Sequence, residues 1–103
     1  MAIMVVLFNL KDGVTPEQYE TWARETDVPA VNALASVERF RVYKSLGLLG
    51  SDAKPPYDYM ELVEIADLDK LAQDAVTEKM REITQQFQAM ADNPVWILLD
   101  QFA

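Results

Sequence analysis

The sequence contains no cysteine and no histidine among its 103 residues. Their absence excludes thiolate nucleophiles, zinc sites of the Cys/His kind, Cys-ligated clusters, His- or Cys-ligated haem and every catalytic triad built on either residue. The chain also lacks EF-hand spacing, a phosphate-binding loop and a dinucleotide glycine fingerprint, and it has only three glycines. We therefore expect no metal and no organic cofactor, so that any chemistry depends on carboxylates, tyrosines, lysines or arginines.

Basic residues are also scarce, because 9 Lys and Arg stand against 17 Asp and Glu, for a formal net charge of −8. A field of this sign repels phosphate backbones and anionic lipids, so we expect neither nucleic-acid binding nor membrane binding. The apolar opening, residues 1–10, is too short to span a bilayer and lacks the basic flank and cleavage site of a signal peptide. These features favour a cytoplasmic protein.

The chain length predicts one domain over residues 1–103, with a single core. Residues 3–8 are all apolar, which predicts a strand that is covered on both faces. Residues 38–46 and 57–65 predict two more strands, joined by an irregular glycine- and proline-containing connection. A fourth strand is predicted over residues 95–102, after a helix that ends at Asn93-Pro94.

Two helical regions lie between these strands. Thr15, Pro16 and Gln18 form a typical helix start, with a hydroxyl cap, a proline in the first turn and an amide that reaches back. Because Pro29 lacks an amide proton, we expect a break near Val28 and a further helical turn through residue 33. The second region begins at a capping aspartate, residue 67, and is amphipathic to residue 90, with a turn around residue 77 that would divide it in two.

The resulting order is strand, helix, strand, strand, helix, strand, which predicts an α+β, ferredoxin-like βαββαβ fold with a four-stranded antiparallel sheet. Helices cover only one face of such a sheet, yet the first and last strands are apolar on both faces. A second copy of the sheet would cover the other face, so we expect a homodimer that forms a dimeric α/β barrel.

The sequence resembles the REDY-like family in segments that together cover most of the chain. These are WARETDVPAV at 22–31, ALASV at 33–37 leading into FRVY at 40–43, PYDYMELVEI at 56–65, and NPVWI at 93–97. The family is associated with gene clusters for pyrrole and indole pigments and lies among the dimeric α/β barrels. The resemblance implies a small, cofactor-free homodimer that acts on or holds an aromatic secondary metabolite. Many members of the wider superfamily use a histidine, which this chain lacks.

The hairpin of the second and third strands carries the first candidate site. If its register is taken from the centre of the connection, Arg41 lies opposite Glu61 and Tyr43 opposite Tyr59, on one face. These residues would form a pocket wall in which the tyrosines sandwich a planar heteroaromatic. Glu61, oriented by Arg41, would accept an N–H or act as general base. Alternatively, they form an ion pair and aromatic pairs at a dimer interface.

Further candidates lie on the first helix and the last strand. Tyr19, Trp22 and Trp96 either line the same pocket or belong to the ordinary core. Asp27 either directs its carboxylate into the cavity or caps the helix that restarts at Pro29. The apolar connection around residues 46–49 is either a lid over the pocket or an arm across the dimer.

These features predict a cofactor-independent protein that binds a pyrrole- or indole-like intermediate and directs its proton transfer, cyclisation or oxidation. The alternative is a non-catalytic carrier or chaperone for such an intermediate or for a partner enzyme. In a third interpretation, the barrel is only a structural core.

Overall fold

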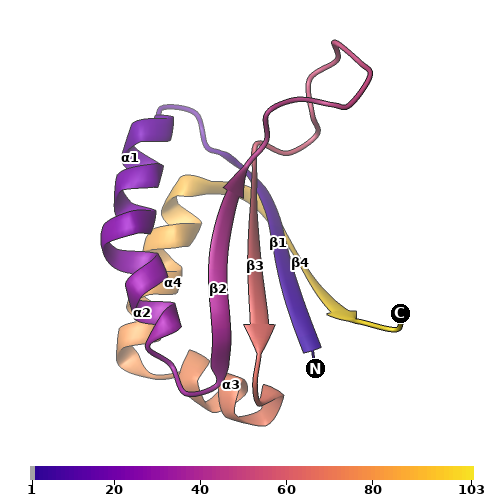
Figure 1. Cartoon of the computed structure of the whole chain (residues 1–103). Helices are drawn as coiled ribbons and strands as arrows, with labels where there is room; N and C mark the ends of the chain where they lie inside the picture. Colours follow the sequence, from indigo (N-terminus) through magenta and orange to yellow (C-terminus); the bar gives the residue numbers. More distant parts are fainter. Residues whose placement is uncertain (1) are drawn as a thin grey trace.

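The computed structural model describes residues 2–103 as one sheet with helices on one of its faces (Figure 1). The predicted ferredoxin-like βαββαβ order is confirmed. In chain order the elements are β1 (Ala2–Leu10), α1 (Pro16–Trp22), the π-helical segment η1 (Ala23–Asp27), α2 (Val28–Asn32), β2 (Val37–Lys44), β3 (Tyr59–Ile65), α3 (Leu68–Ala75), α4 (Glu78–Met90) and β4 (Ala91–Asp100).

The sheet is antiparallel and has the strand order β2-β3-β1-β4. Val6 of β1 pairs with Glu61 on one side and with Trp96 on the other, so these three side chains share the face that the helices cover. Val5 points to the opposite, open face together with its partners Leu62 and Ile97. The first and last strands, β1 and β4, therefore carry apolar residues on both faces, as the sequence predicts.

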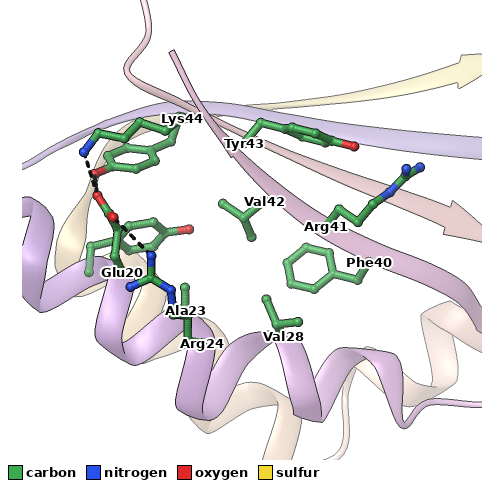
Figure 2. A pocket seen from close by; sticks show the side chains of 11 residues that line it. Glu20, Ala23, Arg24, Val28, Phe40, Arg41, Val42, Tyr43 and Lys44 are labelled. Atoms are coloured by element: carbon green, nitrogen blue, oxygen red, sulfur yellow. Dashed lines mark hydrogen bonds and ion pairs between the residues drawn. The ribbon is translucent and has the colours of Figure 1, made fainter. Parts of the chain in front are cut away.

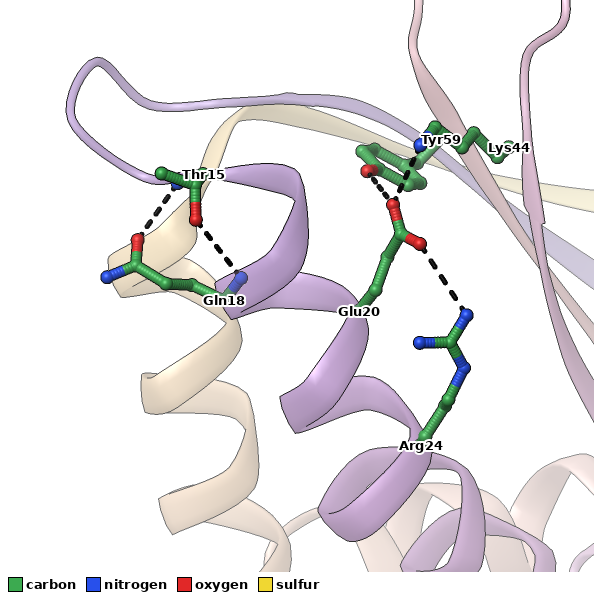
Figure 3. A network of polar contacts seen from close by, with 6 residues as sticks. All are labelled: Thr15, Gln18, Glu20, Arg24, Lys44 and Tyr59. Atoms are coloured by element: carbon green, nitrogen blue, oxygen red, sulfur yellow. Dashed lines mark hydrogen bonds and ion pairs between the residues drawn. The ribbon is translucent and has the colours of Figure 1, made fainter.

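The first helical region does not break at Pro29. Its start is the predicted capping box, in which Thr15 accepts from the Gln18 amide and Gln18 reaches back to Thr15 (Figure 3). Before the proline the chain instead widens into η1, and the Val28 amide donates to the Ala23 carbonyl five residues back. Pro29 then falls in the first turn of α2, where its missing amide is tolerated, so the predicted break is wrong.

The second helical region divides as predicted. Asp67 caps α3 by accepting from the Lys70 amide at 3.0 Å, and Thr77 caps α4 by accepting from the Met80 amide at 3.4 Å. The predicted helix end at Asn93-Pro94 is wrong, because α4 ends at Met90 and β4 starts directly at Ala91. No helix within residues 2–103 is long and apolar enough to cross a membrane.

Aromatic side chains form the core between α1, α4 and the sheet. Phe8 stacks on Tyr59 with ring centroids 5.6 Å apart and meets Tyr19 and Phe87 edge-on at 5.2 and 4.9 Å. A second cluster packs Phe40 and Val63 beneath α2. Together these two clusters fix the distance between the helix layer and the sheet.

The open face and the β2–β3 connection leave apolar surface in water. Val95, Ile97 and Leu99 of β4 are 37–44% exposed on the open face. The connection rises beyond the sheet and away from the helices (Figure 1), and Leu46 and Leu49 in it are fully exposed. Whether this connection is a lid over the pocket or an arm across a dimer remains a prediction.

Candidate functional site

The pairing of β2 with β3 corrects the predicted hairpin site. Val42 lies opposite Glu61 and Lys44 opposite Tyr59, one residue away from the predicted register. Side chains alternate along a strand, so this single step exchanges the two faces of β2 relative to β3. Tyr59 and Glu61 therefore lie on the helix-covered face, whereas Arg41 and Tyr43 lie on the open face. The predicted polar face of four residues does not exist.

The ion pair predicted between Arg41 and Glu61 is likewise wrong. Arg41 Nη2 lies 3.5 Å from Glu64 Oε2, and both side chains are about one-third exposed. The guanidinium also lies over the Tyr43 ring, 5.9 Å from its centroid. These contacts leave Glu61 without a basic partner on its own face of the sheet.

Glu61 and Asp27 form a buried acidic pair between the helices and the sheet. Each is only 5% exposed, and both line the same apolar cleft of about 770 Å³. Burial, and then the nearby charge of Asp27, raises the pKa of Glu61 well above its usual value. Burial also raises the pKa of Asp27 to about 7. At neutral pH the pair therefore retains a proton that ordinary surface carboxylates would have lost.

The π-helical segment explains how Asp27 reaches this place. The Asp27 side chain makes no capping hydrogen bond to α2, so the interpretation of Asp27 as a cap is wrong. The widened turn directs residue 27 inward instead, and Asp27 is a buried residue lining the cleft. Such π-bulges are often found at functional sites.

Tyr19 completes the buried titratable group. Its ring is fully buried, and its hydroxyl has no hydrogen-bond partner within residues 2–103. Burial raises the pKa of Tyr19, and the negative charges of Glu61 and Asp27 raise it further. Oε1 of Glu61 is also buried without a partner among the described residues. A phenol oxygen and a carboxylate oxygen are thus buried near each other without hydrogen-bond partners among the described residues.

The walls of the cleft are apolar and partly aromatic. Trp96 meets Phe87 edge-on at 5.7 Å, and Phe40 contributes a third ring from β2. Aliphatic side chains from all layers complete the lining: Met4, Val6, Val31, Leu34, Val63, Leu68, Leu71, Met80, Ile83 and Leu98. The cleft is therefore mainly apolar, and the acidic pair is a buried polar feature within it.

A second, smaller groove of about 370 Å³ runs along the β2 edge (Figure 2). Glu20 accepts from Tyr59 Oη at 2.7 Å and from Lys44 Nζ at 3.0 Å, and Arg24 Nη2 lies 3.6 Å from its other oxygen (Figure 3). The hydrogen bonds from Tyr59 and Lys44 lower the pKa of Glu20. Burial and this bond to Glu20 raise the pKa of Tyr59. Tyr59 is thus held by Glu20, a residue that the sequence did not single out.

The predicted site residues accordingly separate into three groups. Glu61, Asp27 and Trp96 line the cleft, and Tyr19 is electrostatically coupled to the two acids. The groove is lined by Arg41, Tyr43, Tyr59 and also Tyr19. Trp22 packs between α1 and α4, where its Nε1 donates to Gln86 Oε1 at 2.7 Å and its ring stacks on Phe87.

The sequence missed most of the cleft wall. Phe87, Met80 and Ile83 appear in the sequence as the apolar stripe of an amphipathic helix, a pattern that predicts core packing. Their helical spacing correctly places them on the face of α4 that meets the sheet. Spacing alone carries no signal that a cleft remains between this face and the strands.

The fold, with its open sheet face and a cleft beneath the helices, is that of an α+β protein of the ferredoxin-like class. The family model described as REDY-like protein HapK matches residues 2–102, and the chain belongs to this family. A search of curated proteins gave no match.

Solved structures share this fold. The crystal structure of HapK from Hahella chejuensis has a TM-score of 0.80 and 26% identity, with 99% of this chain and 93% of that chain covered. A dimeric ferredoxin-like protein of unknown function from Thermobifida fusca has a TM-score of 0.75 and 21% identity, with 97% of this chain and 90% of that chain covered. SnoaB from Streptomyces nogalater, a cofactor-independent oxygenase, has a TM-score of 0.76 and 12% identity, covering 99% and 93%.

Proposed function

We propose that the cleft binds a pyrrole- or indole-like intermediate and directs its proton transfer, cyclisation or oxidation without a cofactor. The observation that carries this proposal is the buried pair of Glu61 and Asp27 in an aromatic-walled cleft. Membership in the REDY-like family supports the substrate class, and the similarity to a cofactor-independent oxygenase supports the absence of a cofactor.

In this proposal Glu61 is the proton-transfer group. The carboxylate, when ionised, is a stronger base than a surface glutamate because burial raises its pKa. It removes a proton from a ring N–H or an adjacent carbon of the heteroaromatic and returns the proton to another atom of the same molecule. Asp27 holds the second charge or proton of the pair, and the buried Tyr19, whose pKa the two acids raise, stays a neutral phenol beside them.

The alternative is a non-catalytic carrier that uses the same cleft. One observation favours it: the cleft is open along α3 and β4, where the lining residues Leu68 and Leu98 remain exposed. A site open on this side suits transfer of a bound intermediate to a partner enzyme. Turnover by the purified chain separates the two functions.

We further propose that the chain is a homodimer in which the open sheet faces pack together. The relative from Thermobifida fusca is described as dimeric. The open face exposes apolar side chains to water, and a second copy of the sheet would cover them. Arg41 and Tyr43 lie on this face near its β2 edge, so their role belongs to the interface and its border. The exposed leucines of the β2–β3 connection are placed to reach a second subunit.

The dimer can be tested by charging one face of β4 at a time. Ile97→Lys places an ammonium on the open face and is expected to shift the mass in sedimentation from twice 11.7 kDa to 11.7 kDa at micromolar concentration. Leu98→Lys, the neighbouring position on the helix-covered face, is the matched control and is expected to remain dimeric. A wild-type chain that sediments as a folded monomer would contradict the proposal.

Aromatic binding can be followed through the two tryptophans, because only Trp96 lines the cleft. Bound bipyrrole or indole ligands are expected to quench the fluorescence of Trp22→Phe, which retains Trp96, and to quench Trp96→Phe several-fold less. The affinity is also expected to fall about tenfold in Trp96→Ala, where the ring is lost. Equal quenching in both single-tryptophan variants, or no binding across the ligand panel, would contradict binding in the cleft.

A further inference from the structure

The cleft has an unusual charge balance. Its lining includes three acidic residues, Asp27, Glu61 and Asp69, and among residues 2–103 no lysine or arginine lines it. The nine basic residues of the chain therefore lie elsewhere, for example Arg41 beside Glu64 and Lys44 beside Glu20. A negatively charged guest would find no cation in this cleft.

A second observation indicates what the cleft lacks. Glu61 is 5% exposed, and its Oε1 is buried without a hydrogen-bond donor among the described residues. A buried acceptor without a donor destabilises the folded protein, because its hydration is lost and not replaced. A guest that brings an N–H donor relieves this cost, and a guest that is also positively charged forms the stronger, charge-assisted bond.

The aromatic walls favour the same kind of guest. Phe87 and Trp96 lie edge to face in the cleft lining, and Phe40 lies across from α2. Aromatic faces attract cations, and a delocalised planar cation can stack on a ring while its N–H groups reach a carboxylate. The shape, the unpaired acceptor and the charge of the cleft thus all favour a planar cation that carries N–H donors.

We propose that the cleft binds its ligand as a cation, namely a planar nitrogen heteroaromatic whose positive charge is shared among N–H donors, as in a protonated imine, amidine or amino-heteroarene. This inference rests on the proposed function, because it takes the aromatic cleft as the ligand site and adds the charge state of the ligand. A neutral or anionic ring of the same shape binds more weakly.

Binding of a cation is linked to the protonation of the acidic pair. The titratable groups near the pair are Tyr19 from α1, which is coupled to both acids, and Asp69 from α3 in the cleft lining, and neither carries a positive charge. Burial raises the pKa of Asp27 to about 7, so below this pH the pair is more protonated and attracts a cation less. The affinity for a cationic ligand is therefore expected to increase between pH 5.5 and pH 7.5.

The experiment compares three tricyclic probes of similar shape: proflavine, which is cationic at neutral pH, hydroxymethylanthracene, which is neutral, and anthracene carboxylate, which is anionic. Fluorescence titration of the full chain is expected to give at least about tenfold tighter binding of proflavine than of the neutral probe. Glu61→Gln is expected to lose about tenfold in proflavine affinity and little for the neutral probe. Glu64→Gln is the matched control, because it makes the same charge change on the same strand but on the open face.

The outcomes are distinct. Equal or tighter binding of the neutral or anionic probe overturns the cationic ligand and leaves the aromatic cleft in place. If Glu61→Gln and Glu64→Gln lose the same affinity for proflavine, the dye is attracted by net charge only, and this result also overturns the proposal of a cationic ligand. If no probe binds, both the proposed binding of an aromatic ligand in the cleft and this inference are contradicted. Circular dichroism verifies that Glu61→Gln is folded, and Asp27→Asn provides a second variant with the same expected loss.

Discussion

Glu61→Gln is expected to lower the turnover of the bound heteroaromatic by about 10²–10⁴-fold, the range typical of a lost general base. Glutamine keeps the size and shape of the side chain, so the affinity for a cationic ligand falls by only about tenfold, and the larger part of the loss falls on kcat. The measurement is single-turnover kinetics on whichever pyrrole or indole substrate the wild-type chain converts.

Glu64→Gln is the control for this experiment, since residue 64 lies on the same strand with its side chain on the open face beside Arg41. Its turnover is expected to match the wild type. If Glu61→Gln retains full activity, Glu61 is not the base. If the wild-type chain binds the ligand without converting it, the carrier function is supported instead.

The second large effect is an inverted dependence of stability on pH. Asp27 has an ordinary pKa near 4 in the unfolded chain and a pKa of about 7 when folded, so between these values the folded state binds more protons. The free energy of unfolding therefore decreases as pH rises through this window and levels off above it. From pH 5 to pH 8 we expect a loss of about 3 kcal/mol from Asp27 alone, and Glu61 acts in the same direction.

Asp27→Asn removes this contribution, because the amide does not titrate. Chemical denaturation at fixed protein concentration is expected to show a flatter profile for this variant and a higher stability than the wild type at pH 8. Glu25→Gln, an exposed position in the same π-helical segment, is expected to keep the wild-type profile. A wild-type chain that is no more stable at pH 5 than at pH 8 would show that Asp27 is not the buried, proton-binding group described above.

The order of elements was predictable from the sequence, whereas the register of the β2–β3 hairpin was not. Capping residues such as Thr15 and Asp67 and the apolar periodicity of the helices depend on local physics that a single sequence displays. The register depends on a long irregular connection, where no tight turn type fixes the pairing. The pattern of β3 also misleads, because the acidic Glu61 stands in a row with the buried residues Tyr59, Val63 and Ile65.

The candidate site was predictable residue by residue but not as a constellation. Glu61, Asp27, Tyr19 and Trp96 were all candidates from the sequence, yet the geometry that joins them depends on the strand register and on the phase of the first helical region. Arg41 and Tyr43 were grouped with them only through the wrong register. A buried carboxylate without a partner can be recognised only when the whole fold is assembled around it.

The position of Asp27 in the site depends on the number of residues in the π-helical segment η1. An α-helix turns by about 100° per residue, so one residue more or less rotates everything after it by more than a quarter of a turn. The single extra residue in the widened turn therefore sets the angular position of Asp27 relative to Tyr19, which comes before it on the same helical rod. Substitutions within residues 24–26 leave this angle unchanged, whereas deletion of one of them would return the segment to regular α-helix and carry the carboxylate away from Glu61. The number of residues between Tyr19 and Asp27 therefore matters more to the acidic pair than the identity of those residues.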